Sequence, residues 1–227
     1  EQYAIYGVTR LQLAKPLKLI TGARMSWWRR DQEAARYTPV PFTLREDGIF
    51  TPYAGLILDV TGNLSAYVSY SRIFNPQNSQ DRNGDYLPPV QGANYEAGLK
   101  GEWMNGRLRA SAALFRIEQD NFAVADGSNP DTGRPFFRPA RGTVSKGYEG
   151  EIAGKILPGW DLSLGWSAFT AKDVDGLPVQ PAHPGRVLRM STRYDFGGAL
   201  DGFSFGGSLR WESRPPMSAV NAGTELN

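Results

Sequence analysis

Apolar and polar residues alternate along most of the chain, and apolar positions at helical spacing are hard to find. The alternation is clearest in 64–71, 95–103, 147–156 and 160–170. A period of two residues places successive side chains on opposite faces of a strand. Each of these segments is therefore predicted to be a β-strand with one apolar face and one polar face.

Extending this pattern along the chain predicts ten strands: 3–13, 17–30, 50–60, 64–74, 93–104, 107–119, 143–156, 160–171, 186–196 and 203–213. Short connections rich in Gly, Pro and Asn alternate with long polar ones, as expected for turns and surface loops. The long connections are 31–49, 75–92, 120–142 and 172–185. Short turns at one end and long loops at the other are typical of an outer-membrane β-barrel.

The length of the strands and the placement of aromatic residues support the same class. Several predicted strands run 11–14 residues, whereas a membrane strand needs about 9–11 when tilted and strands most often have about 5–6. Trp103 and Trp160 stand beside short turns, and Tyr53, Tyr70 and Tyr194 lie near other strand ends. This placement predicts aromatic girdles at the two membrane interfaces.

The polar faces are predicted to line the inside of the barrel, because a small soluble barrel would need an apolar interior. Charged residues on these faces are expected to pair across strands inside the lumen: Glu96, Lys100, Glu102, Glu149, Glu151 and Lys155. The residues alone leave open an ordinary solvated sheet face.

Composition excludes several classes of function. The 25 Lys and Arg nearly balance the 23 Asp and Glu, which argues against a strongly basic nucleic-acid binder. Cysteine is absent and His183 is the one histidine, so thiolate metal sites and multi-histidine zinc sites are excluded. The sequence contains no apolar run long enough for a transmembrane helix. It shows no leader peptide, so we expect that one was removed or that the chain is a piece of a longer protein.

The amino-acid sequences of the strands, taken in their order along the chain, resemble those of a known family. The segments that carry the likeness are 50–59 (FTPYAGLILD), 64–77 (LSAYVSYSRIFNPQ), 94–102 (NYEAGLKGE), 106–121 (GRLRASAALFRIEQDN), 145–154 (SKGYEGEIAG) and 157–166 (LPGWDLSLGW). Together they resemble the barrel of TonB-dependent ferric-siderophore receptors of the ferripyoverdine and ferric-coprogen type. The likeness runs through nearly the whole chain in the family's order.

This resemblance implies an all-β fold: an antiparallel transmembrane segment of about ten strands from a 22-strand barrel, with residues 1–227 as a partial barrel domain. Family members also have a signal peptide, a TonB box and a plug domain, which we expect to lie outside this chain. Counting strand directions from the short turns places these as strands ten to nineteen. Since unpaired strand edges are not tolerated in lipid, we expect this segment to fold in a membrane only with the rest of the barrel.

By the same resemblance, the expected function is energised uptake of ferric siderophores across the bacterial outer membrane. No bond is made or broken in the ligand, so we expect a transporter rather than an enzyme. No cofactor is expected, because iron enters as a ferric-siderophore chelate. The expected partners are the ferric siderophore, the TonB complex through the plug, and outer-membrane lipid or lipopolysaccharide; nucleic acid is not one.

A bowl of rings and cations suits an anionic chelate, and candidates for it are expected on inward positions near the long-loop end. On strands they are Trp28 and Arg30, with Arg24 below them by parity, then Tyr67, Arg72 and Phe74; in long loops they are Tyr86, Phe122, Phe136 and Phe137. For each of these residues, a role in packing or in an aromatic girdle explains its position as well as contact with the ligand does. Arg116, beside Phe115, does not fit a clean alternation, and a bulge there would exchange the faces.

Three further motifs are predicted to have structural rather than ligand-binding roles. Asp81–Asp85 has carboxylates spaced like a calcium loop but lacks the distal Glu, so a surface turn is predicted. His183 is predicted to lie in a loop that leads into a strand. Gly-x-Gly pieces around 197–207 lack the βαβ setting of a nucleotide site.

Two other functions are compatible with parts of the pattern. A passive porin-like channel shares the polar lumen and the girdles but needs no plug. A soluble β-sandwich or propeller acting as a binding module would need its apolar faces to pack on each other.

Overall fold

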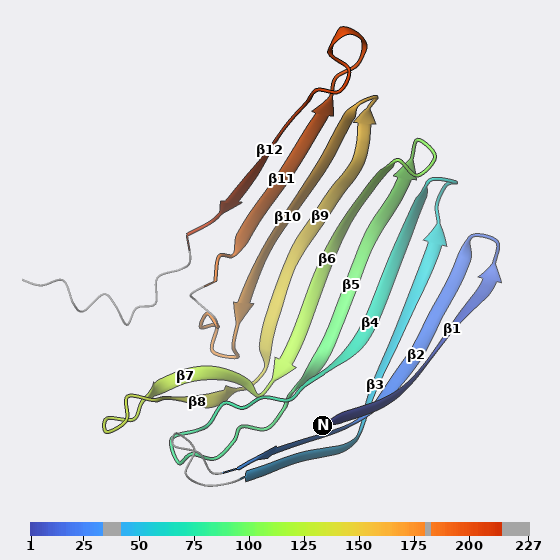
Figure 1. Cartoon of the computed structure of the whole chain (residues 1–227). Coiled ribbons are helices and arrows are strands. Elements are labelled where there is room, and N and C mark those ends of the chain that lie inside the picture. Colours follow the sequence, from blue (N-terminus) through green and yellow to red (C-terminus); the bar gives the residue numbers. More distant parts are fainter. Residues whose placement is uncertain (34–41, 180–182, 215–227) are drawn as a thin grey trace, which may run out of the picture.

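The computed structural model describes residues 1–33, 42–179 and 183–214, which form one ten-stranded antiparallel sheet and a separate hairpin (Figure 1). The strands of the sheet, in spatial order, are β1 (Gln2–Ala14), β2 (Leu17–Gln32), β3 (Phe42–Asp59), β4 (Leu64–Asn75), β5 (Val90–Trp103), β6 (Leu108–Asp120), β9 (Thr143–Leu157), β10 (Trp160–Lys172), β11 (Arg186–Asp195) and β12 (Ser204–Glu212). The hairpin pairs β7 (Phe122–Ser128) with β8 (Pro135–Ala140). All ten predicted strands are therefore confirmed.

The connections are sorted by length as predicted. Short turns join the strands at one end of the sheet, and the long connections and the β7–β8 hairpin gather at the other (Figure 1). We call these the short-turn end and the long-loop end. Among the described residues β1 and β12 each have one neighbouring strand, so the sheet is open and ends in two bare edges.

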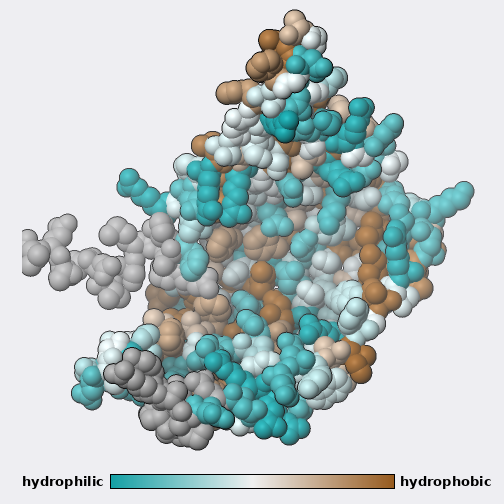
Figure 2. Space-filling model, viewed as in Figure 1, coloured by the Kyte–Doolittle hydropathy of each residue, from teal (hydrophilic) through white to brown (hydrophobic). Residues whose placement is uncertain are grey.

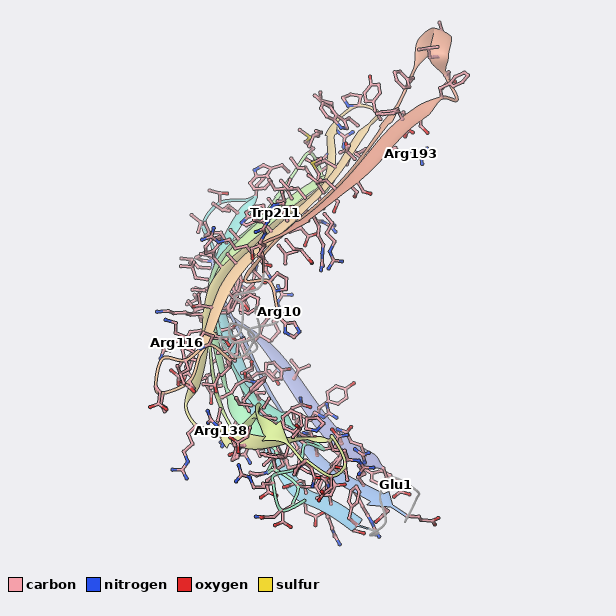
Figure 3. The ribbon with its side chains drawn as sticks, turned by 90° about the vertical axis from the view of Figure 1, so that its left-hand side faces the viewer. Glu1, Arg10, Arg116, Arg138, Arg193 and Trp211 are labelled. Carbon is pink, nitrogen blue, oxygen red and sulfur yellow. The ribbon has the colours of Figure 1, made fainter. Side chains whose placement is uncertain are left out.

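The sheet curves, so that it has a concave and a convex face. Figure 3 shows Arg10 and Arg193 on the concave side and Arg116 on the convex side. Ladder register extends this assignment to every strand, because cross-strand partners share a face. Arg10 is opposite Ile20, for example, and that position continues through Gly55, Ser69 and Glu96.

The two faces differ in polarity. On the convex face Val68, Leu99, Leu114 and Tyr148 are 53%, 48%, 66% and 51% exposed. The concave face is a mosaic of hydrophilic and intermediate side chains with smaller hydrophobic patches (Figure 2). In the described part of the chain no second layer covers the apolar face, which is the opposite of what a soluble β-sandwich requires.

Three details differ from the sequence-based expectation. The expected loop 120–142 contains the β7–β8 hairpin. The expected loop 31–49 is largely strand, since β3 begins at Phe42 and passes through a register shift opposite Ser26 and Trp28. Gly48 lies in that shift with φ +66°, a conformation that glycine adopts without strain.

Two predictions about faces are also corrected. Tyr53 is not a girdle residue: it pairs with Gly22 and Ser71 on the concave face, and a Cβ on Gly22 would meet its hydroxyl. No bulge occurs at Arg116, because β6 keeps continuous register with both neighbours there. Arg116 therefore alternates onto the convex face with Leu114.

No helix in the described ranges is long and apolar enough to cross a membrane. Those same ranges contain no group of three or more His, Cys, Asp or Glu side chains that could hold a metal ion.

Candidate functional site

Three segments that are distant in sequence meet at the long-loop end. The Tyr86 ring packs on the Phe42 ring with centroids 4.2 Å apart, and the Arg30 guanidinium carbon lies 5.9 Å from the Phe42 centroid. Burial raises the pKa of the Tyr86 hydroxyl, and the nearby charge of Arg30 partly opposes that shift. We call Arg30, Phe42 and Tyr86 the loop-end cluster; it combines aromatic surface with a positive charge.

The loop that supplies Tyr86 is held by a tight turn. Gln80 and Tyr86 form a β-bridge, and between them the Asp81 carboxylate accepts hydrogen bonds from the backbone N–H groups of Asn83 (2.8 Å) and Asp85 (2.9 Å). Asp81 is thus used to close the turn, as Asp commonly does. The prediction of a surface turn at Asp81–Asp85 is confirmed.

The same loop contacts the β7–β8 hairpin. The Arg82 guanidinium carbon lies 5.0 Å from the centroid of the Phe136 ring, and the Phe137 N–H donates to the Gln80 carbonyl at 2.8 Å. The loop therefore links the loop-end cluster to a second cation–ring pair. Sequence reasoning identified Arg30, Tyr86 and Phe136 but missed Phe42 and Arg82, because their ring and cation partners come from other strands and loops.

The other candidates occupy different places. Trp28 lies on β2 on the concave face and is partly buried. Arg24 is exposed on the same face, where it lines a hollow of about 580 Å³ with Tyr6 and Tyr53. Phe122 begins β7 opposite Ala140.

Arg72 and Phe74 do not share a face with Tyr67. All three lie on β4, and the odd separation from Tyr67 places Arg72 and Phe74 on the convex side with Val68 and Tyr70. By register, the expectation that they point inward is therefore wrong, although Arg72, at the place where β3 and β4 separate, also lines the hollow that contains Arg24 and Tyr53. Both line a small hollow of about 290 Å³ with Phe50, where β3 and β4 stop pairing.

Tyr67 is part of a polar network on the concave wall. Its hydroxyl donates to the Glu96 carboxylate, and the Lys100 ammonium lies 4.6 Å from the centroid of its ring. A Cβ on Gly98 would come within 2.8 Å of that ring, so glycine is what lets the ring lie flat against β5. Glu96 and Lys100, which were expected to pair with charges on other strands, both lie on β5 and instead contact Tyr67 from β4.

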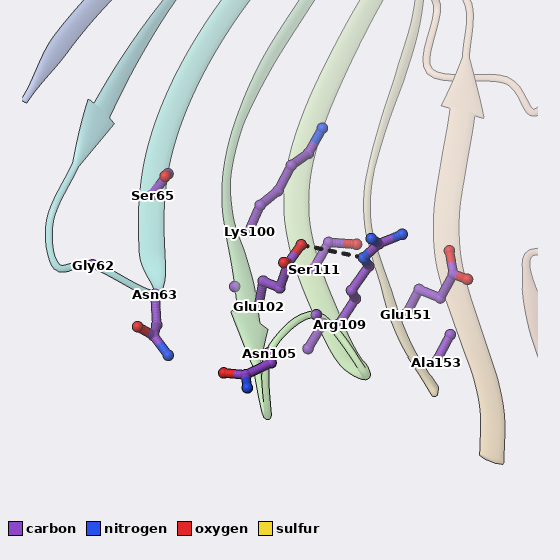
Figure 4. A pocket seen from close by; sticks show the side chains of 13 residues that line it. Gly62, Asn63, Ser65, Lys100, Glu102, Asn105, Arg109, Ser111, Glu151 and Ala153 are labelled. Atoms are coloured by element: carbon purple, nitrogen blue, oxygen red, sulfur yellow. Dashed lines mark hydrogen bonds and ion pairs between the residues drawn. The ribbon is translucent and has the colours of Figure 1, made fainter. Parts of the chain in front are cut away.

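The concave wall has a charged hollow of about 750 Å³ near the short-turn end (Figure 4). Glu102 pairs with Arg109 across the β5–β6 turn at 3.3 Å, while Lys100, Ser111 and Glu151 line the hollow beside them. Lys155 pairs with Asp161 at 3.1 Å nearby. Of the six residues expected to pair in the lumen, Glu102 and Lys155 form ion pairs, with partners that were not predicted.

Aromatic side chains mark the short-turn end of the convex face. Trp160 and Tyr194 are cross-strand partners with centroids 6.4 Å apart, and the Trp160 indole N–H donates to the Thr192 hydroxyl at 2.7 Å. Trp103 is partly exposed on the same face. These three residues fit the predicted interfacial girdle. His183, also as predicted, is exposed in the connection before β11.

Comparison with known proteins shows which protein family has this architecture. The family model "TonB dependent receptor-like, beta-barrel" matches residues 1–226. The chain belongs to this family. Its open sheet is a segment of an outer-membrane β-barrel, which agrees with its sorted loops, its apolar convex face and its girdle.

Individual relatives of this TonB-dependent receptor barrel are similar over nearly its whole length. The ferric-pyoverdine 358 receptor of Pseudomonas putida is 37% identical over 221 residues, which are 96% of this chain and 27% of that protein. The ferripyoverdine receptor of Pseudomonas aeruginosa is 36% identical over 226 residues, again 27% of its length. The chain thus spans about a quarter of the length of these relatives.

Solved structures of outer-membrane receptors have the same fold over nearly the whole of this chain. The alcaligin outer-membrane receptor FauA from Bordetella pertussis superposes with a TM-score of 0.78 at 39% identity, covering 94% of this chain and 37% of FauA. The ferripyoverdine receptor of Pseudomonas aeruginosa bound to ferripyoverdine gives a TM-score of 0.78 at 34% identity, covering 93% of this chain and 28% of that receptor.

Proposed function

We propose that the protein to which this segment belongs takes up ferric siderophores across the outer membrane in a TonB-dependent manner, and that the loop-end cluster forms part of the siderophore-binding surface. The observation that carries the proposal is the convergence of Arg30, Phe42 and Tyr86 at the long-loop end of a barrel whose relatives are named as ferric-siderophore receptors.

The cluster suits an anionic chelate. Rings give a flat apolar surface against which a chelate can pack, and guanidinium groups attract negative charge without losing their own proton. Arg30, on β2, and Arg82, in the connection between β4 and β5, supply that charge. Iron is the cargo and arrives already chelated, so the protein supplies no iron ligand and no resident cofactor.

The remaining parts of the function are assigned to regions outside this chain. Energy comes from the TonB complex acting through a plug domain that fills the lumen. No covalent bond of the siderophore changes, so the protein is a transporter and not an enzyme. The polar network of Tyr67, Glu96 and Lys100 on the concave wall suits contact with a polar plug better than contact with lipid.

Uptake of radioactive iron tests the proposal. The full-length protein is produced in a bacterium that lacks its own siderophore receptors, with the TonB gene intact or deleted. Ferric complexes of a pyoverdine, alcaligin and ferrioxamine B are supplied separately. At least one should be accumulated in the TonB-intact strain and none in the deletion strain.

Two results would contradict this function. Equal uptake with and without TonB would indicate a passive channel. Absence of uptake for every complex, from a strain in which the protein is correctly inserted, would remove the siderophore assignment.

A further inference from the structure

Buried apolar side chains are concentrated where the long connections lie rather than in the sheet itself. Of the five that are buried in the described ranges, four belong to the long-loop end: Leu87, Val90, Ala140 and Val179. Surface loops usually have few buried contacts and open easily. The long connections of this chain therefore differ from ordinary surface loops.

Asn121 joins two of these connections at their bases. It has φ +65°, a conformation that residues other than glycine rarely adopt and that Asn tolerates better than most. Its backbone N–H donates to the Ala140 carbonyl at 2.9 Å, which closes the base of the β7–β8 hairpin. Its side-chain amide donates to the Pro89 carbonyl at 3.0 Å, and its own carbonyl accepts the Gln77 amide at 2.7 Å. Asn121 thus connects the hairpin to both ends of the connection between β4 and β5.

Gln77 closes the base of that connection. The same Nε2 that donates to the Asn121 carbonyl also donates to the Pro88 carbonyl, and the Leu87 N–H donates to the Ser79 carbonyl at 2.9 Å. The chain between these groups is therefore a closed loop of the Ω type. Tyr86 of the loop-end cluster lies beside the base of this loop.

The hairpin has further links away from its base. The hydrogen bond from the Phe137 N–H to the Gln80 carbonyl holds β8 against the Ω loop. Arg138 lies 4.0 Å from the Asp173 carboxylate in the connection after β10. That carboxylate has only 5% of its side chain exposed and accepts two backbone N–H groups of its own connection. An element held both at its base and along one strand cannot turn about either link alone.

We infer that residues 76–89 and the β7–β8 hairpin (Figure 1) form one preformed unit, and that Gln77 and Asn121 are positioning residues that set where Tyr86 lies for ligand binding. Hydrogen bonds that are closed before the ligand arrives remove the entropy cost of ordering a loop during binding. The ordered state can be measured without any ligand, whereas the positioning role rests on the proposed function.

Hydrogen exchange tests the preformed unit. Amide exchange of the purified full-length protein in detergent is followed by mass spectrometry in the absence of siderophore. Peptides within 76–89 and 135–141 should exchange roughly a hundredfold more slowly than synthetic peptides of the same sequence. Exchange as fast as in the synthetic peptides, whether or not a siderophore slows it, would overturn the inference.

Variants locate the links. Gln77→Glu has nearly the same shape but cannot donate to the two carbonyls, and Asn121→Ala loses the side-chain hydrogen bond and is strained at φ +65°. Each should speed exchange within 76–89 roughly tenfold. Asn121→Gly, which adopts this φ without strain, should have a smaller effect than Asn121→Ala.

Asn129→Ala is the matched control. It removes the acceptor of two N–H groups in the turn of the same hairpin and should leave exchange within 76–89 unchanged. Migration of the unheated and heated protein on a gel verifies that each variant is folded. Unchanged exchange in both Gln77→Glu and Asn121→Ala would show that these residues do not hold the unit together.

Siderophore affinity separates a positioning role from a purely structural one. The probe is whichever ferric complex of a pyoverdine, alcaligin or ferrioxamine B is accumulated in the uptake assay, and binding is followed by quenching of tryptophan fluorescence. Asn121→Ala should weaken binding roughly fivefold in the wild-type background and by less than about twofold in the Tyr86→Ala background, because it acts through that ring.

Equal losses of affinity in the two backgrounds, or unchanged affinity despite faster exchange, would overturn the positioning role. If the wild-type protein binds none of the three complexes, the proposed function fails, and the exchange measurement alone decides whether the preformed unit exists.

Discussion

The concave and convex faces of this sheet are built from the same strands, yet they are suited to different surroundings. On β4, Tyr67 faces the concave side and hydrogen-bonds Glu96, whereas its neighbour Val68 is 53% exposed on the convex side. A one-residue step along the chain therefore separates a polar network from a lipid-facing surface. The face of the sheet on which a side chain lies, more than its neighbours in the sequence, therefore decides what that side chain can contact.

The difference in polarity between the concave and convex faces becomes smaller toward the long-loop end, where both faces are cationic. There the convex face gains Arg72, Arg116 and Lys146, while the concave side gains the loop-end cluster. Both are cationic, but one lies level with a pair of tyrosines at the edge of the apolar band and the other is assembled partly from loops. The first group lies on the lipid-facing side of the sheet, and the second lies on the side that we propose binds the siderophore.

The largest effect should come from placing a charge on the lipid-facing side. Leu99→Arg should lower the free energy of unfolding of the full-length protein in lipid vesicles by about 2–4 kcal/mol. Leu99 is 48% exposed and lies midway along β5 between Tyr95 and Trp103. Ser111→Arg, at the charged hollow of the concave wall, is the control and should cost much less. Equal losses in a denaturant titration would mean that the faces are wrongly assigned.

A smaller effect is expected at Gly98, where the absence of a side chain leaves room for the Tyr67 ring. Gly98→Ala should destabilise the protein by about 1–3 kcal/mol, since its Cβ would lie 2.8 Å from the Tyr67 ring and 2.6 Å from the Ala112 carbonyl oxygen. Gly165→Ala, which meets nothing within 4 Å, provides the matched comparison in the same titration. If the two variants are equally stable, the close packing of Tyr67 on β5 is not present in solution.

Loss of one concave hydrogen bond should cost less again. Tyr67→Phe removes the donor to Glu96 and should destabilise the protein by about 1 kcal/mol. Tyr70→Phe changes the same residue type on the opposite face of β4 and tests whether the effect belongs to the concave network. A Tyr67→Phe variant as stable as Tyr70→Phe would argue that water replaces the hydrogen bond without cost.

The smallest effect is predicted for the ion pair at the short-turn end. Glu102 and Arg109 are 3.3 Å apart, but their side chains are 56% and 71% exposed. Exposed pairs contribute about 0–1 kcal/mol, so Glu102→Gln should change unfolding by less than about 0.5 kcal/mol at physiological salt. A loss of several kcal/mol would show that the pair is shielded in the intact barrel.

The sequence was sufficient to predict the ten strands and the sorting of their connections, because a period of two and the turn residues are local signals. It also predicted Trp160 and Trp103 as girdle residues. The β7–β8 hairpin was missed because polar residues and Gly hide short strands inside a loop. Tyr53 stands near a strand end, which favours a girdle, but its parity along β3 places it on the concave face.

The candidate site was predicted less completely. Arg30, Tyr86 and Phe136 were found from residue type and position near long loops. Phe42 and Arg82 were not, because their roles depend on contacts between segments separated by about forty residues or more. Arg72 and Phe74 lie at an odd separation from Tyr67 along β4, and this parity predicts the opposite face from the one expected for them.

Direct binding of a ferric siderophore tests the central claim, that the long-loop end of the concave side holds the ligand. The purified full-length receptor is titrated with the ferric siderophore found active in uptake, and quenching of tryptophan fluorescence is followed. Arg30→Gln and Tyr86→Ala should each weaken binding roughly tenfold, through loss of a charge or a ring contact, while Arg193→Gln near the short-turn end should bind like the wild type. Unchanged affinity in both loop-end variants would contradict the account.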